Sequence, residues 1–202
     1  SAQVLFLDCA DQTAHSVPLG SQAPALLVID SGVSHSLAEG AYAQRRAECE
    51  QASALLGVKI LRDVRPEQLA RLKGEMVLQQ RATHVVSENE RVRDAVAAIE
   101  QGQWDRMGAL MTRSHESLRD DYEVSCPELD LLIELATAQR GVYGAKMTGG
   151  GFGGCVIALV ETDQIEAVAD SISGQYGDRI GGAPWCYRVQ AGAGAREICT
   201  AL

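Results

Sequence analysis

Hydrophobic and polar positions change their spacing along the chain, and the spacing predicts strands separated by helices. An uninterrupted apolar run over 25–29 is typical of a buried strand. Beyond it, apolar residues recur at the three-to-four-residue spacing of one helix face, and glycines stand where several of these helices would end. The pattern predicts helices over 42–56, 66–74, 78–102, 104–118, 125–141 and 163–172, and strands over 4–7, 15–19, 25–29, 155–160 and 185–189.

Two short motifs predict where helices begin. Ser125 with Glu128, and Asp163 with Glu166, have the spacing of a capping box. In this motif the first side chain accepts a hydrogen bond from the backbone of the first helical turn. We therefore expect Ser125 and Asp163 to cap the helices that follow them.

The order of the elements favours an α+β fold, in which helices pack against an antiparallel sheet. The first two strands are separated by a polar turn and form a predicted hairpin over residues 1–20, which we expect to belong to an adjoining N-terminal domain. Residues 21–202 are predicted to form the main domain. The Ala- and Gly-rich stretch at 191–195 is expected to be a loop or a tail.

Composition indicates a globular domain and argues against two classes of partner. Of the 202 residues, 46% are hydrophobic, which is enough for a sizeable core, and no apolar run is long enough to cross a bilayer. A net charge of −9 would repel a phosphate backbone, so we expect neither a nucleic-acid nor a membrane partner. Six scattered cysteines without a C-x-x-C pair, and four histidines without ligand spacing, indicate a reducing cytoplasm and no metal site.

The most distinctive segment is a glycine cluster, with five glycines among the six positions 149–154. Without Cβ atoms, such a loop can turn its N–H groups toward an anion or let another loop lie against it, whereas a plain hairpin turn is the alternative. The cluster also satisfies G-x-G-x-x-G, but a strand rather than a helix follows it, which excludes a dinucleotide-binding loop. The remaining motifs of a protein kinase are absent, and so is a Walker loop.

Four segments of the chain carry distinctive motifs. They are 30–50, with S-H-S-L followed by Y-x-x-R-R-x-x-C-E; 81–91, beginning R-A-T-H-V-V; 114–130, with S-L-R-D-D-Y-E-V-S-C-P-E-L-D; and the glycine cluster. Together these segments resemble galactokinases, and the glycine cluster also resembles a motif of the wider family of small-molecule kinases that includes homoserine kinase and mevalonate kinase. The resemblance covers nearly the whole chain, and it implies that residues 21–202 are a kinase C-terminal domain.

The resemblance implies ATP-dependent phosphorylation of galactose at C1, giving galactose 1-phosphate. Family members carry a sugar motif, a glycine- and serine-rich ATP loop, a catalytic aspartate and a transition-state arginine upstream of the matching region, and this chain lacks them. It is therefore expected to be the C-terminal half of a galactokinase, inactive alone and without catalytic or metal-binding residues. ATP and Mg²⁺ would be bound mainly by the N-terminal half of the same protein. An N-acetylgalactosamine kinase and a non-catalytic galactose-binding sensor on the same fold are the alternatives.

The resemblance assigns roles to four residues. Tyr42 matches the family tyrosine that contacts galactose, although a tyrosine on an apolar helix face is more often core packing. Gly149, Gly150 and Gly151 match the family motif that lies beside the phosphate-binding loop and supports it. These are the candidate substrate-binding and loop-supporting residues of this chain.

The other matching positions are expected to be structural. Gly32 and Ser34 depart from the residues common in relatives, which argues against a direct phosphate contact there. Arg45 and Arg46 lie on a helix surface and are expected to form ion pairs with carboxylates. The two histidines expected to pack in the interior or to form supporting hydrogen bonds are His84 and His115.

Overall fold

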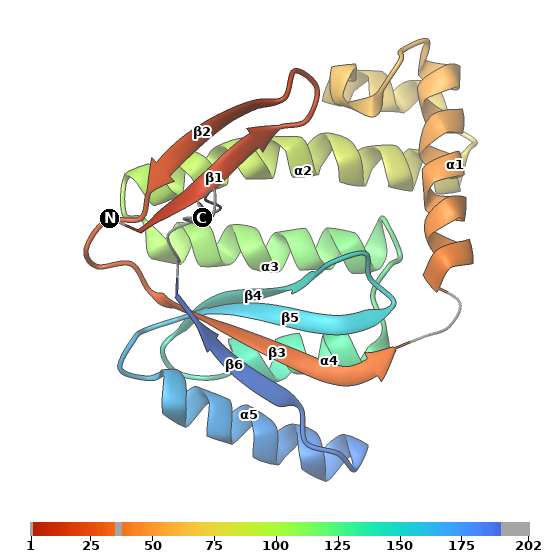
Figure 1. Cartoon of the computed structure of the whole chain (residues 1–202). Coiled ribbons are helices and arrows are strands. Elements are labelled where there is room, and N and C mark those ends of the chain that lie inside the picture. The colour runs from red at the N-terminus through yellow and green to blue at the C-terminus, as the bar shows by residue number, and fades with distance from the viewer. Residues whose placement is uncertain (1, 35–37, 191–202) are drawn as a thin grey trace, which may run out of the picture.

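The computed structural model describes residues 2–34 and 38–190, which form a four-stranded antiparallel sheet with helices and a separate hairpin (Figure 1). The strands are β1 (Gln3–Asp8), β2 (Thr13–Pro18), β3 (Ala25–Ser34), β4 (Val142–Thr148), β5 (Gly153–Val160) and β6 (Trp185–Val189). The helices are α1 (Ala38–Leu56), α2 (Met76–Glu100), α3 (Trp104–Asp120), α4 (Pro127–Thr137) and α5 (Ile165–Ile180), with 3₁₀ helices η1 (Leu61–Asp63) and η2 (Pro66–Leu72). The predicted α+β class is confirmed.

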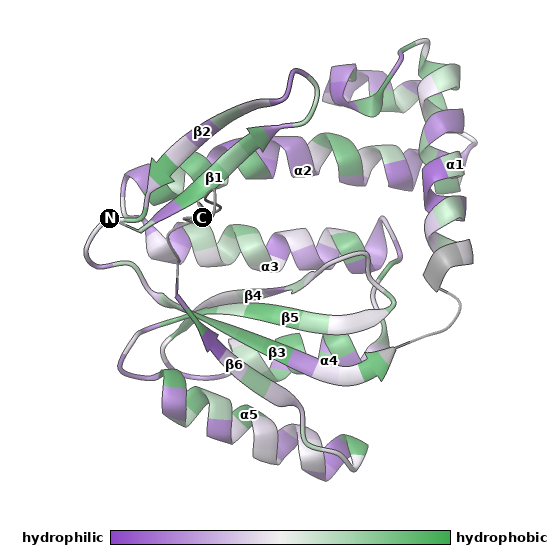
Figure 2. Cartoon of the chain, viewed as in Figure 1, coloured by the Kyte–Doolittle hydropathy of each residue, from purple (hydrophilic) through white to green (hydrophobic). Residues whose placement is uncertain are grey.

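The main sheet has the strand order β4-β5-β3-β6, and every neighbouring pair is antiparallel. The apolar run at 25–29 begins β3, where successive side chains point to opposite faces. Leu27 and Ile29 are fully buried in a core shared with α4 and α5, which cover one face of the sheet. Hydrophobic residues occupy much of the two central strands, β3 and β5 (Figure 2).

The opposite face of the sheet is open at its β6 edge. Leu26, Val28 and Asp30 of β3 pair with Val189, Tyr187 and Trp185 of β6, and paired residues project from the same face. The exposed fractions of the last three are 37% for Val189, 50% for Tyr187 and 66% for Trp185. An apolar and aromatic surface therefore lies uncovered beside the core.

Helices α1 and α2 pack with η1 and η2 around a second, smaller core. Its buried members are Ala52, Leu56, Leu61, Val64, Leu72, Ala82 and Val86. Helix α3 contacts both α2 and β4. Gly108 of α3 and Gly144 of β4 lie so close that a Cβ on Gly144 would be 2.0 Å from the Gly108 carbonyl oxygen. This backbone contact fixes β4, the strand that leads into the glycine cluster.

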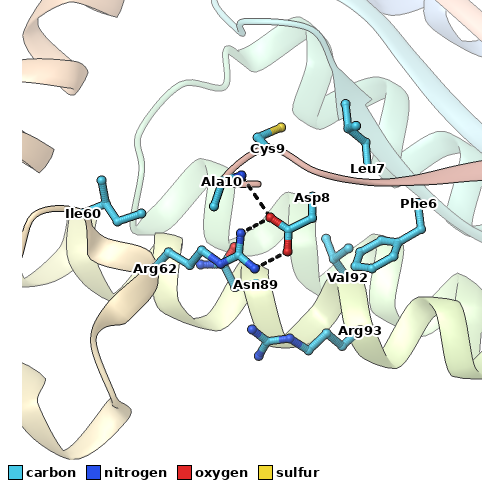
Figure 3. Close-up of a pocket in the computed structure, with 10 residues that line it drawn as sticks. All are labelled: Phe6, Leu7, Asp8, Cys9, Ala10, Ile60, Arg62, Asn89, Val92 and Arg93. Carbon is cyan, nitrogen blue, oxygen red and sulfur yellow. Dashed lines mark hydrogen bonds and ion pairs between the residues drawn. The ribbon is translucent and has the colours of Figure 1, made fainter. Parts of the chain in front are cut away.

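The N-terminal hairpin of β1 and β2 is a sheet of its own, and β2 packs against α2. Asp8 is ion-paired with Arg62, whose guanidinium lowers the Asp8 pKa to about 2. A pocket of about 380 Å³ lies between the hairpin and α2 beside this pair (Figure 3). The hairpin is confirmed, whereas its assignment to an adjoining domain stays a prediction.

Both predicted capping boxes are wrong. Cys126 and Gln164 occupy the N-cap positions of α4 and α5, and neither helix has a side-chain cap. Pro127 takes the first helical position of α4, so Ser125 lies one residue too early to cap it. The Ser125 hydroxyl instead donates to Asp130 Oδ1, at 2.6 Å.

Other helix boundaries also differ from the predictions. The segment predicted as a helix over 66–74 is the 3₁₀ helix η2. Helix α4 ends at Thr137 and not at 141, while α5 continues to Ile180, where Gly181 in the left-handed conformation ends it. The tail predicted at 191–195, and His35 to Leu37 of the first matching segment, lie outside the described residues. None of the described helices has both the length and the apolar character needed to cross a membrane.

Candidate functional site

The glycine cluster forms the turn between the antiparallel strands β4 and β5, as the hairpin interpretation predicted. In this glycine loop, residues 149–152, φ is +90° at both Gly149 and Gly151 and +62° at Phe152. Positive φ is unfavourable for residues with a Cβ, so the backbone path by itself requires glycine at 149 and 151. Any further role must come from what surrounds the loop.

The surroundings differ sharply between neighbouring glycines. A Cβ on Gly151 would lie 2.3 Å from the Val124 carbonyl oxygen and 2.8 Å from the Val124 Cβ. A Cβ on Gly149 or Gly150 would meet nothing within 4 Å. Gly150 also lacks a positive φ. Neither the local packing nor the backbone conformation of the described chain therefore requires a glycine at 150.

The loop rests on residues 121–124, which connect α3 to α4 and which we call the clamped segment. The Phe152 amide donates to the Val124 carbonyl oxygen at 2.7 Å, which joins the glycine loop to this segment. Two arginines hold the segment from the other side. Arg81 of α2 donates to the Asp121 carbonyl oxygen at 2.6 Å, and Arg45 of α1 donates to the Tyr122 carbonyl oxygen, also at 2.6 Å.

Glu48 of α1 ties the two arginines together. Its Oε2 lies 2.7 Å from Arg81 Nε and 3.1 Å from Arg45 Nη1. Burial favours the neutral acid, but the hydrogen bonds from Arg81 and Gln44 and the arginine charges outweigh it and hold the Glu48 pKa below its usual value. Glu48 is therefore an anion between two cations at neutral pH.

Tyr42 lies one turn before Arg45, near the N-terminal end of α1, which is the helix that follows β3. This end of α1 and the β4–β5 turn lie on the same side of the molecule (Figure 1). Tyr42 is 62% exposed, so it does not pack in the core that the described residues form. Its contact with a sugar stays a prediction.

The ion pairs predicted for the two arginines and the supporting hydrogen bonds predicted for the two histidines are confirmed, but the Arg45 side chain is 11% exposed and not on the helix surface as expected. Arg46 forms an exposed ion pair with Glu50 at 2.9 Å, and Arg45 pairs with Glu48. His84 is 6% exposed, and its Nδ1 lies 3.0 Å from the Ser117 hydroxyl. The buried His115 lies with Nε2 3.1 Å from Asp130 Oδ1.

His84 also stacks on the clamped segment. Its ring lies 4.5 Å, between centroids, from the ring of Tyr122. Burial lowers the His84 pKa to about 4, so the imidazole is neutral at physiological pH. Burial likewise raises the pKa of the Tyr122 hydroxyl, which lies 3.6 Å from Cys49 Sγ.

The residues available for anion or metal binding are few. Within residues 2–34 and 38–190, no group of three or more His, Cys, Asp or Glu side chains is placed to hold a metal ion. Gly32 has φ +70°, and its amide donates to Asp30 Oδ1 at 3.0 Å, so this N–H already has a partner. The orientation of the Ser34 side chain is outside what the structure describes.

The contacts of Arg81 with Glu48 and Glu123, which form a clamp on residues 121–124, were not predicted from the sequence. A signal was present, because Arg81 falls three residues after Leu78 and next to Ala82 on the apolar face of the predicted helix. A charged residue on such a face needs a buried partner. The acidic run at 120–123 offered several, but the sequence does not show which one lies near.

Comparisons with known proteins support the sequence resemblance. Residues 95–178 match the family model "GHMP kinases C terminal". The chain is 43% identical over 198 residues to the galactokinase of Homo sapiens, covering 96% of this chain and 49% of that protein. It is 42% identical over 204 residues to the galactokinase of Streptomyces coelicolor, covering 98% and 52%. It thus spans about half the length of the curated relatives it matches.

A solved structure shares the fold closely. The crystal structure of Lactococcus lactis galactokinase complexed with galactose matches 98% of this chain and 53% of that chain, with a TM-score of 0.91 and 34% sequence identity. The predicted galactokinase-type C-terminal fold is confirmed.

Proposed function

We propose that this chain belongs to the galactokinase group of the GHMP kinases and supplies one wall of the active site of an ATP-dependent galactokinase. The whole protein would transfer the γ-phosphoryl group of ATP to the C1 hydroxyl of galactose, releasing ADP and the hydroxyl proton. The observation that carries the proposal is the match of nearly the whole chain to a galactokinase that binds galactose. N-acetylgalactosamine is the alternative sugar.

Tyr42 would form part of the galactose site. Its ring is exposed, and α1 is held in place by the bonds from Arg45 to the clamped segment. An aromatic ring offers an apolar face to the C–H groups of a sugar, and the phenol offers one hydrogen bond. Tyr42 would therefore bind and orient the sugar without taking part in proton transfer.

The glycine loop would lie against the phosphate-binding loop of the other half. The residues present fit that role, because the space above Gly149 and Gly150 is open and a side chain at either position would fill it. When ATP is bound, it supplies the phosphoryl group, and the glycine loop would shape the cleft around it. Magnesium does not fit the described residues of this chain, which offer no cluster of ligands. We assign any Mg²⁺ ligands to the other half.

The other half of the same protein is the proposed partner of the open sheet face. Trp185, Tyr187 and Val189 expose an apolar and aromatic surface continuous with Leu26 and Val28. Such a surface is typical of a protein interface. The galactokinase relatives are about twice as long as this chain, so each has a further segment that could cover it. The free cysteines among the described residues support a cytoplasmic location for the protein.

The test is a substrate survey with the full-length protein. We expect ATP-dependent formation of a C1 phosphate from galactose, measured by coupled ADP release and confirmed by the phosphorus spectrum of the product. Preference for N-acetylgalactosamine would change the substrate and keep the reaction class. Galactose binding by calorimetry without ADP release would instead identify a sensor.

A further inference from the structure

We infer that Arg81 is a positioning residue, which fixes the glycine loop relative to the Tyr42 helix by holding the clamped segment between them. The inference rests on the proposed function, because the glycine loop and Tyr42 are proposed walls of the same site. Arg81 itself would contact neither sugar nor nucleotide.

The guanidinium of Arg81 bonds to three residues, one in α1 and two in the clamped segment. Nε donates to Glu48 Oε2 of α1 at 2.7 Å, Nη1 donates to the Asp121 carbonyl oxygen at 2.6 Å, and Nη2 pairs with the carboxylate of Glu123. Its side chain is 2% exposed. A buried guanidinium is costly unless all its directions are satisfied, so this geometry couples the position of α1 to that of the clamped segment.

Arg45 strengthens the same coupling from α1. It donates to two successive carbonyl oxygens, those of Tyr122 at 2.6 Å and Glu123 at 3.1 Å. Glu123 has φ +52°, a conformation that a non-glycine residue adopts only when its surroundings hold it. The two arginines and Glu48 provide that restraint.

The segment in turn supports the glycine loop. The Val124 carbonyl oxygen accepts the Phe152 amide, and it is also the atom that a Cβ on Gly151 would strike. The Val124 side chain is 3% exposed, so the segment has little room to move alone. A shift of Asp121 to Val124 would therefore carry the glycine loop with it, while α1 and Tyr42 would stay with their own core.

The test substitutes lysine in the full-length enzyme. Arg81→Lys keeps the charge but has one ammonium group, which cannot reach three fixed acceptors at once. We expect kcat at saturating galactose and ATP to fall at least about tenfold. The matched control is Arg91→Lys on the same helix, because the bonds of Arg91 within the described residues go to Glu88, at 2.7 Å, and to Ser87, and not to the clamped segment. It should keep kcat within about twofold.

Hydrogen exchange gives a readout that needs no activity. In Arg81→Lys, but not in Arg91→Lys, exchange of peptides covering 149–154 should rise at least about fivefold. A double-mutant cycle with Gly150→Val should show less than multiplicative losses in kcat, because both changes would disturb the same contact between the glycine loop and the phosphate loop of the other half. If Arg81→Lys does not fold, Arg45→Lys takes its place, since Arg45 holds the same segment.

The outcomes separate the inference from the proposed function. If exchange in the glycine loop rises in Arg81→Lys, the mechanical link holds. If the wild-type protein nevertheless phosphorylates no sugar, the proposed function is overturned while that link stands. A less stable Arg81→Lys enzyme with unchanged loop exchange would overturn the inference. So would unchanged kcat, or strictly multiplicative losses in the cycle.

Discussion

The clamped segment and the glycine loop lie against each other, yet their surroundings are opposite. The segment is bonded on both sides, by two arginines from α1 and α2 and by the Phe152 amide. In the loop, a Cβ on Gly149 or Gly150 would meet nothing within 4 Å. We call the clamped segment, with Gly151 and His84 packed against it, the inner layer, and Gly150 and Tyr42 the rim. Substitutions in the inner layer should lower the stability of the protein. Substitutions at the rim should instead affect activity, and only when a second half and its substrates are present.

The largest expected effect is that of Gly151→Val, which places a side chain in the inner layer. Its Cβ would lie 2.3 Å from the Val124 carbonyl oxygen, at a φ of +90° that valine strongly disfavours. We expect a loss of about 3 kcal/mol or more in the free energy of unfolding of the full-length protein. Denaturant unfolding measures it. Wild-type stability would show that the contact with Val124 is not as close as described.

The stability of the inner layer should also depend on pH, because His84 is buried there. Burial lowers its folded pKa to about 4, whereas the unfolded imidazole titrates near 6.5. Below the unfolded value, only the unfolded state takes up the proton, so stability falls as the pH decreases between these two values. From pH 7 to pH 4.5 this amounts to about 2 kcal/mol.

His84→Gln should remove that part of the pH dependence. Denaturant unfolding of the wild type and the variant at both pH values gives the difference directly, and other titrating groups cancel in the comparison. Parallel stability curves would show that His84 accepts a proton in the folded protein.

Gly150→Val tests the rim beside the buried contact. Nothing in the described chain lies within 4 Å of the added Cβ, so stability should change by less than about 1 kcal/mol. In the full-length enzyme, kcat/KM should fall at least about tenfold, equivalent to about 1.4 kcal/mol, because the side chain would enter the space of the phosphate loop. Helical circular dichroism and a melting temperature are the controls. Normal kinetics in a less stable protein would make the loop purely structural.

Tyr42→Phe should have the smallest effect and should be selective. Loss of the hydroxyl would leave a sugar hydroxyl without a partner, at a cost of about 1 kcal/mol or about fivefold in galactose affinity. Because Tyr42 is 62% exposed, stability should hardly change. Steady-state kinetics with each substrate varied in turn separates the KM values. Equal losses for galactose and ATP would contradict a sugar-wall role.

Local patterns in the sequence were enough to predict much of the fold. The apolar run of β3, the helical spacing of α2 and the glycine turn each depend on neighbouring residues, and each is confirmed. The prediction that Ser125 caps α4 was wrong, because Pro127 takes the first helical position and moves the start of the helix by one residue. Such a shift depends on local geometry that a motif of two residues does not contain.

The candidate site was predictable only in part. Gly149 and Tyr42 were found from the resemblance, but the sequence gives no reason to separate Gly150 from Gly151, because the difference lies in the distance to Val124. The Arg81 clamp joins residues between 33 and 42 positions apart. Contacts over such separations depend on the packing of α1, α2 and the segment after α3, which local periodicity does not determine.

The shared site is tested most directly by assaying this chain alone and after mixing it with the remaining part of the full-length protein. With galactose and ATP, we predict background turnover for each part alone and formation of galactose 1-phosphate by the complex. Clear production of galactose 1-phosphate by this chain by itself would contradict its role as one wall of a site completed by another half.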